Sequence, residues 1–178
     1  RLFADTLCSA LNLHRVSAPL FVEASTGLND DLNGVERKVC FDALDIPRNI
    51  EVVQSLAKWK RMALYEYGFH HGKGLYCDMN AIRRDEELDN IHSIYVDQWD
   101  WEKVITREQR TLAYLKKIVR RIYEAIKVTE NKLYVEFPQI EPMLPEDIFF
   151  IHSVELMRQY PNLSPKEREN AITKKHKA

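Results

Sequence analysis

Glycine and cysteine are both scarce in this chain, and neither is arranged in a motif. The 178 residues include only five glycines and three cysteines. No glycines form the G-x-G-x-x-G or G-x-x-x-x-G-K-[ST] loops that cradle phosphate in many folds, so a nucleotide would have to be bound through side chains or another fold. Cys8, Cys40 and Cys77 lie far apart and lack histidines at metal-finger spacing, which indicates ordinary free thiols in a reducing cytoplasm.

Excess charge of either sign and long apolar runs are also missing. The 26 lysines and arginines balance 27 aspartates and glutamates, so no global basic field favours nucleic acid or an anionic membrane surface. Apolar runs such as residues 148–151 are far shorter than the roughly 20 residues that span a bilayer. With 45% hydrophobic and 30% charged residues, the composition is typical of one soluble domain. We expect a cytoplasmic protein without membrane or nucleic-acid partners, since no export leader opens the chain.

Hydrophobic periodicity predicts a mixture of helices and strands. Apolar residues at helical spacing predict helices over residues 2–13, 55–67, 106–126, 154–159 and 164–171. Alternating or short apolar runs predict strands over residues 16–23, 39–44, 50–53, 93–99 and 148–153. Residues 26–34 are dense in turn formers, which predicts a polar loop between strands.

Several residues also mark where helices begin. Ser55 is a candidate N-cap for the helix over 55–67, and Thr106 with Gln109 forms a capping-box pattern ahead of the longest helix. Ser164, followed by Pro165 at the first helical position and Glu167 three residues on, is a second and more complete start signal.

The densest polar group is D-Q-W-D at residues 97–100. In a strand, Gln98 and Asp100 share one face while Asp97 and Trp99 share the other. A carboxylate beside an amide suits a small zwitterion, because the acid attracts an ammonium group and the amide hydrogen-bonds a neighbouring carbonyl. The same pattern fits a strand end with ordinary surface acids, and spacing alone leaves both readings open.

The other charged clusters are equally ambiguous. Three cations at residues 58–61 fit either a solvated helix face or a site for phosphate or a substrate carboxylate. The arginines at 83–84, followed by acids at 85–87, fit a surface ion-pair cluster. His70 and His71 are adjacent and lack a carboxylate at regular spacing, so we expect no metal site. None of these groups alone identifies a reaction.

Longer blocks are more specific. They are V-V-Q-S-L-A-K-W-K-R at 52–61, G-L-Y at 74–76, H-S-I-Y-V-D-Q-W-D-W-E at 92–102 and I-H-S-x-E-L at 151–156. Together and in this order they closely resemble ammonia-dependent asparagine synthetase, the aspartate–ammonia ligase family, from about Leu7 to Ala171. The resemblance implies an α+β fold, an antiparallel sheet flanked by helices like the catalytic domain of class II aminoacyl-tRNA synthetases. Residues 1–178 would form the N-terminal portion of a single such domain, incomplete at its C-terminus.

The resemblance also implies a reaction. Enzymes of this family use ATP to adenylate the β-carboxylate of L-aspartate and release pyrophosphate, after which ammonia attacks the β-aspartyl adenylate and gives L-asparagine and AMP. ATP and Mg²⁺ are implied, the ion because it offsets the triphosphate charge, and so is a homodimer. The missing glycine loop agrees with a synthetase-like ATP site.

Some site residues follow from the match with the family motifs. Asp30 matches the active-site acid that would receive ammonium and help to remove its proton. Asp31 stands where the family has Asn, so the sequence leaves open which of the two carboxylates faces the substrate. Ser55 and Lys60 match substrate-contacting positions, and Lys60 suits a carboxylate.

The remaining site residues come from the segments around 83 and 93–100. Arg83 would neutralise the reacting carboxylate and phosphate, and Gln98 would hold the carbonyl oxygen. Asp100 would pair with the α-ammonium, and Asp97 is counted with the substrate-binding residues. The positions beside the adenylate are Ser93 and Val96.

The family's ATP-clamping arginines lie downstream of the last residues of this sequence, so we expect residues 1–178 alone to be inactive. A competing hypothesis is a non-catalytic relative of class II synthetases that binds an amino acid or contacts tRNA. A retained substrate site is favoured by the acids at 30 and 100, the amide at 98 and the cations at 60 and 83. A tRNA-charging enzyme is a third possibility, but no anticodon-binding module is recognisable.

Overall fold

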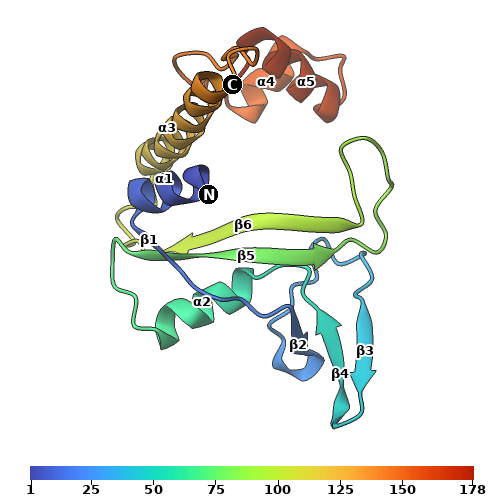
Figure 1. Cartoon of the computed structure of the whole chain (residues 1–178). Helices are drawn as coiled ribbons and strands as arrows, with labels where there is room; N and C mark the ends of the chain where they lie inside the picture. The colour runs from blue at the N-terminus through green and yellow to red at the C-terminus, as the bar shows by residue number, and fades with distance from the viewer. The chain divides into compact units, whose positions relative to one another are not determined.

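The computed structural model describes residues 1–178, which form helices, strands and connecting loops (Figure 1). The helices are α1 Leu2–Leu11, α2 Ala57–Glu66, α3 Leu112–Glu136, α4 Ser153–Gln159 and α5 Pro165–His176, with a 3₁₀ turn η1 at Ala24–Thr26. The strands are β1 Leu13–Arg15, β2 Phe21–Glu23, β3 Cys40–Ala43, β4 Ile46–Val52, β5 Gly74–Ile82 and β6 Tyr95–Lys103.

The chain divides into two compact units. The sheet unit is Leu7–Tyr114, and the helical unit combines Arg1–Thr6 with Leu115–Ala178. The predicted α+β class is confirmed, since all but one of the strand pairings are antiparallel. That residues 1–178 form part of a single catalytic domain stays a prediction. No helix combines the length and apolar character needed to cross a membrane.

The first sheet of the sheet unit has the order β1-β5-β6. β1 runs parallel to β5, and β6 pairs antiparallel with β5 along its whole length, from Gly74 opposite Lys103 to Ile82 opposite Tyr95. Central strand β5 was not predicted from the sequence, although residues 77–81 alternate between buried apolar side chains and less buried polar ones. The strand predicted at 93–99 is confirmed as β6, shifted two to four residues toward the C-terminus.

The second sheet has the order β2-β4-β3 and is antiparallel throughout. The strand predicted at 39–44 is confirmed as β3. β4 is longer than predicted and includes Pro47, which lies outside the stretch of β4 that pairs with β2. The continuous strand predicted over 16–23 is wrong: residues 16–20, with Pro19, form the connection between β1 and β2.

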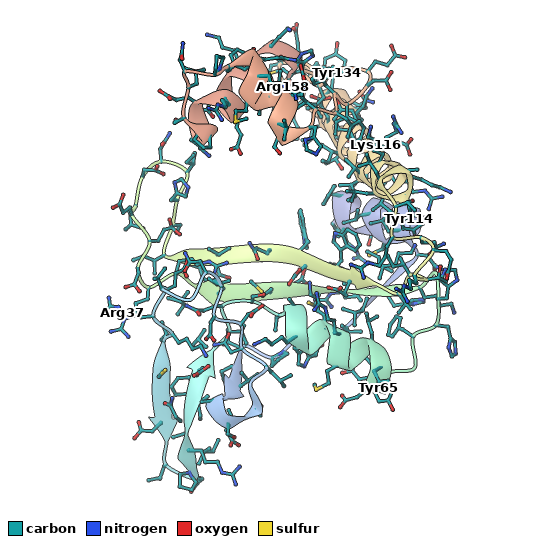
Figure 2. The ribbon with its side chains drawn as sticks, turned by 180° about the vertical axis from the view of Figure 1, so that it is seen from behind. Arg37, Tyr65, Tyr114, Lys116, Tyr134 and Arg158 are labelled. Atoms are coloured by element: carbon teal, nitrogen blue, oxygen red, sulfur yellow. The ribbon has the colours of Figure 1, made fainter.

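Helix α2 and strand β5 build the core of the sheet unit. Alternate β5 residues pack with apolar residues that precede or belong to α2. They are Leu75, Cys77, Met79 and Ala81 on β5, with Val53, Leu56, Trp59, Ala63 and Leu64. Tyr65 lies on the outer face of α2 and points away from the sheet (Figure 2). The predicted N-cap is shifted by one residue: Leu56 is the N-cap, and Ser55 Oγ accepts from the Ala57 N–H at 3.3 Å.

Several predicted element ends differ in and near the helical unit: α1 ends at Leu11 rather than 13, the long helix ends at Glu136 rather than 126, and its start and the end of α5 also differ. The long helix begins at Leu112 rather than 106, because Thr106 and Gln109 close a preceding turn and Thr111 Oγ1 accepts from the Tyr114 N–H at 3.2 Å. The predicted capping box of Ser164 and Glu167 is confirmed, although α5 continues to His176.

The predicted strand over 148–153 is wrong. Its apolar residues pack against side chains instead of pairing with a strand: Phe149 stacks on His176, and the Phe150 ring faces Lys116 and Arg120. The segment then leads into α4, whose predicted range is confirmed and whose N-cap is His152.

Candidate active site

Lys60 is a charged residue in the core. It is 4% exposed, and its Nζ donates to the Asp100 carboxylate and, at 3.2 Å, to the Trp101 carbonyl oxygen. Glu102 Oε2 lies 3.8 Å from the same nitrogen. A buried ammonium group is tolerated only when it is paired and hydrogen-bonded. α2 and β6 therefore bring together two residues, Lys60 and Asp100, that the sequence analysis assigned to the substrate.

The alternation of β6 decides which side chains join them. Val96, Gln98, Asp100 and Glu102 lie on one face, opposite the core residues of β5. Gln98 is exposed there, whereas Val96 packs against the core. Asp97 lies on the other face of β6, opposite Asn80 in the register. The structure therefore groups Gln98 with Asp100 and separates Asp97 from them.

Cys77 is paired with Asp100 across strands β5 and β6 but is a poor nucleophile. Its side chain is fully buried, and its Sγ donates weakly to the Asp100 carbonyl oxygen at 3.5 Å. Burial raises the pKa of the Cys77 thiol to about 11, with a further contribution from the nearby Asp100 charge. Because the thiolate is the reactive form, this cysteine is suited to packing rather than covalent chemistry.

Asn29 ties the loop after β2 to the end of β4. Its buried side chain donates to Glu51 Oε2 at 3.1 Å and to the Val52 carbonyl oxygen at 3.2 Å, and it accepts from the Gln54 N–H at 2.8 Å. These bonds anchor the chain immediately before Asp30. The half-exposed Asp30 carboxylate lies 3.6 Å from Lys58 Nζ, which is a loose ion pair.

The neighbouring Asp31 is held more firmly. Lys38 Nζ lies 2.8 Å from Asp31 Oδ1 and 3.0 Å from Glu51 Oε2. The hydrogen bond from the Lys38 ammonium, reinforced by its charge, lowers the pKa of Asp31. Of the two adjacent carboxylates, Asp30 is thus the less constrained.

Arg83 extends from the end of β5 toward the same region. Its guanidinium donates to the Gln54 carbonyl oxygen at 3.0 Å, and its N–H donates to Ile94 O at 2.7 Å, which continues the β5-β6 pairing by one residue. Ser93 immediately precedes Ile94 and is exposed in the segment before β6. Hydrogen bonds thus link the chain beside Asp30 to Gln54 and Arg83, next to Ser55.

A second arginine stabilises the segment after β5. The backbone N–H and guanidinium of Arg37 both donate to Asp85, the former at 2.8 Å, and the side-chain hydrogen bond is the main reason for the lowered pKa of Asp85. Arg37 is labelled in Figure 2. This contact joins the loop before β3 to the segment that follows Arg83.

Sequence reasoning missed several residues that build this region: Asn29, Lys38, Glu51, Gln54 and Glu102. Gln54 and Glu102 stand inside the family-like blocks, so those blocks were a usable signal. Glu51 interrupts an apolar strand, but nothing local points to Asn29 or Lys38, whose roles depend on contacts across the fold. No three His, Cys, Asp or Glu side chains within residues 1–178 gather closely enough to hold a metal ion.

Comparison with known proteins supplies the family context. A family model described as aspartate-ammonia ligase matches residues 1–178. The chain is 63% identical over 173 residues to an aspartate–ammonia ligase of Clostridium perfringens, covering 97% of this chain and 52% of that protein. It is 59% identical over 177 residues to one of Ruminiclostridium cellulolyticum, covering 99% and 53%. The chain spans about half the length of these curated relatives.

Solved structures support the fold. An Entamoeba histolytica asparaginyl-tRNA synthetase, solved with asparaginyl-adenylate, has a TM-score of 0.56 at 10% identity, over 97% of this chain and 39% of that one. A Desulfitobacterium hafniense pyrrolysyl tRNA synthetase has a TM-score of 0.51 at 14% identity, over 70% and 44%. The expected likeness to the class II synthetase fold is confirmed, and at these identities the comparison concerns the fold alone.

Proposed function

Because this chain belongs to the aspartate-ammonia ligase family, we propose that it carries the aspartate-binding part of an enzyme that makes L-asparagine from L-aspartate, ammonia and ATP. The supporting observation is the buried Lys60 and its partner Asp100, beside Gln98 on the same face of the sheet. A homodimer in the cytoplasm, as the family resemblance implies, is part of the proposal.

The Lys60–Asp100 pair suits an amino acid. Its ammonium and carboxylate are complementary to the α-carboxylate and α-ammonium of aspartate, which would share or replace the existing ion pair. The α-carboxylate and α-ammonium of the substrate bring equal and opposite charges to the pair, so the charges at Lys60 and Asp100 remain balanced on binding. Gln98 would orient the side-chain carbonyl, and Ser55 would contact the substrate from the start of α2. Asp97, on the opposite face, has no direct contact in this scheme.

The reaction has two steps. A β-carboxylate oxygen of aspartate attacks the α-phosphorus of ATP, and pyrophosphate leaves. Ammonia then attacks the β-carbonyl carbon, the bond from that carbon to the AMP oxygen breaks, and AMP leaves with the bonding electron pair. Arg83 would offset the negative charge of carboxylate and phosphate in the first step. Asp30, the less constrained acid, would take a proton from ammonium before the second step.

For the nucleotide we propose contacts from two residues only. Val96 would meet the adenylate through its backbone, because its side chain packs against the core. Ser93 would offer its exposed hydroxyl. Mg²⁺ would accompany ATP and offset its charge, and no residue of this chain is assigned to it, because no suitable group of carboxylates gathers here.

The first test measures AMP formation by the product of the full open reading frame that encodes these residues. With aspartate, ATP and ammonium we expect turnover that needs all three. Binding of aspartate without AMP formation would instead support a non-catalytic amino-acid-binding protein. Absence of both would contradict the proposal.

A matched pair of variants tests the choice of acid. We expect Asp30→Asn to lower ammonium-dependent turnover by about 100-fold or more and to leave aspartate-dependent exchange of pyrophosphate into ATP, because only the second step needs the base. Asp31→Asn, which loses the Lys38 contact, should lower turnover by less than about tenfold. Near-normal turnover by Asp30→Asn would refute the role given to Asp30.

A further inference from the structure

A cavity of about 590 Å³ lies beside Arg83 in the sheet unit. Its lining comes from the loop before β3, from Gln54, two residues after the end of β4, and from the segment after β5. The lining residues are Leu32, Asn33, Glu36, Gln54, Arg83, Arg84, Asp85 and Glu86. Only Arg83 among them has been assigned a role in the reaction.

Two acceptor atoms in this lining are buried without a hydrogen-bond partner in the protein: Gln54 Oε1 and Glu36 Oε2. Gln54 is only 2% exposed, and its other polar groups are all engaged. Its Nε2 donates to the Arg37 carbonyl oxygen at 3.2 Å, which fixes the amide so that the oxygen, and not the nitrogen, is the unpartnered atom. Unpaired buried acceptors are rare, which makes the cavity that both residues line a candidate binding site.

The two unpartnered atoms of the lining suit a small cationic donor. Arg83 and Arg84 also line the cavity, but their guanidinium groups donate to the carbonyl oxygens of Gln54 and Lys38. The unpartnered amide oxygen and carboxylate oxygen accept hydrogen bonds, so they suit a ligand with several N–H groups. Glu36 has no ion pair, whereas Asp85 is engaged by Arg37. A divalent metal would lack further ligands, since no three carboxylate, His or Cys groups gather here.

Among the proposed reactants, aspartate and ATP are anionic, and only ammonium is a small cation with N–H donors. We propose that Glu36 and Gln54 bind the incoming ammonium ion before it reaches the adenylate, an inference that rests on the proposed function. The location agrees with this role. The backbone of Gln54 is bonded both to Asn29, immediately before Asp30, and to Arg83. Ammonium would stay protonated at this site and lose its proton later, to Asp30.

The experiment uses the full-length protein and separates ammonium binding from adenylation. Glu36→Gln keeps the size of the side chain and removes its charge. We expect it to raise the KM for ammonium about tenfold, and to leave the KM for aspartate and the ammonium-independent exchange of pyrophosphate into ATP within about twofold. Glu86→Gln, which changes an exposed acid in the same lining, should change all three by less than about twofold.

A direct measurement accompanies the kinetics. Line broadening of ¹⁵N-labelled ammonium at pH 7 should be seen with the wild-type protein and lost with Glu36→Gln. An unchanged KM for ammonium in Glu36→Gln, or equal losses in exchange and in ammonium use, would overturn the site. If ammonium broadening depends on Glu36 but no aspartate-dependent exchange is seen, the cation site is supported and the proposed function is overturned. If exchange is seen but broadening does not depend on Glu36, the proposed function is supported and the cation site is overturned.

Discussion

The sheet unit and the helical unit bury their side chains differently. All buried polar or charged residues lie in the sheet unit: Asn29, Glu51, Gln54 and Lys60. Their partners are distant in sequence, and the Lys60–Asp100 contact, for example, joins residues 40 positions apart. In the helical unit the buried residues Ala4, Ile118, Tyr123, Ala125 and Ile172 carry no charge, and helix starts depend on neighbours two or three residues away. Every candidate site residue lies in the sheet unit, where strands and helices from distant positions supply partners for the buried charge of Lys60.

The largest effect is expected from breaking the central contact of the sheet unit. Lys60→Met should lower the free energy of unfolding by about 2–3 kcal/mol, less than the roughly 3–5 kcal/mol for a fully buried pair, because the Asp100 side chain stays 25% exposed. Turnover should fall by about 100-fold or more, since the proposed carboxylate contact is lost. Urea unfolding and AMP formation measure the two effects.

Arg61→Met is the control for Lys60→Met. Arg61 is the next residue on α2, and its side chain is 71% exposed at 3.7 Å from Glu102. Loss of such a surface pair should cost less than about 1 kcal/mol. Equal effects of the two substitutions would show that burial of Lys60 has no special importance.

The next effect concerns close packing within the sheet unit. A Cβ added at Gly74 would meet the Glu102 carbonyl oxygen, and Leu13 Cδ2 at 2.7 Å, so neither β1 nor β6 leaves room for it. Gly74→Ala should therefore cost about 1–3 kcal/mol through overpacking. The urea midpoint measures this. Gly34→Ala is the control: Gly34 lies in a loop with open space around it but has φ near +85°, so this substitution measures the cost of backbone strain alone. A smaller loss of stability from Gly74→Ala than from Gly34→Ala would contradict the packing argument.

A local effect is expected in the helical unit. Ser164→Ala removes one half of the capping box and should lower stability by about 1 kcal/mol. Ser153→Ala is the matched control, because the N-cap of α4 is His152 and not Ser153. Thermal unfolding compares the two. A larger loss from Ser153→Ala would show that the cap has been assigned wrongly.

The smallest effect concerns pH. The Arg37 contact lowers the pKa of Asp85 below its unfolded value of about 3.9, so the contact stabilises the fold above that pH and is lost as pH falls through the lower folded pKa. Urea midpoints of the wild-type protein and Asp85→Asn should differ at pH 6 and converge toward pH 2.5. A constant difference across this range would contradict the ionic origin of the contact.

Some predictions made from local signals were accurate, although Thr106 and Gln109 close a turn before α3 and Leu56, rather than Ser55, is the N-cap of α2. The helix over 154–159 and the capping box at 164–167 were predicted closely, since each depends on residues a few positions apart. Predictions that needed a neighbouring element were weaker. Residues 148–153 have the composition of a strand but pack against helices. Strand β5 was missed even though residues 77–81 alternate between apolar and polar side chains.

The same division holds for the candidate site. Sequence blocks pointed to the family, to Lys60, Gln98 and Asp100, and to the shared face of the last two, because the period of a strand is a local property. The pairing of Lys60 with Asp100, the anchoring of Asn29, and the unpartnered acceptors of Gln54 and Glu36 depend on the fold. The sequence by itself determines the type and spacing of the side chains. Their burial and their partners arise only when segments far apart in the sequence pack together.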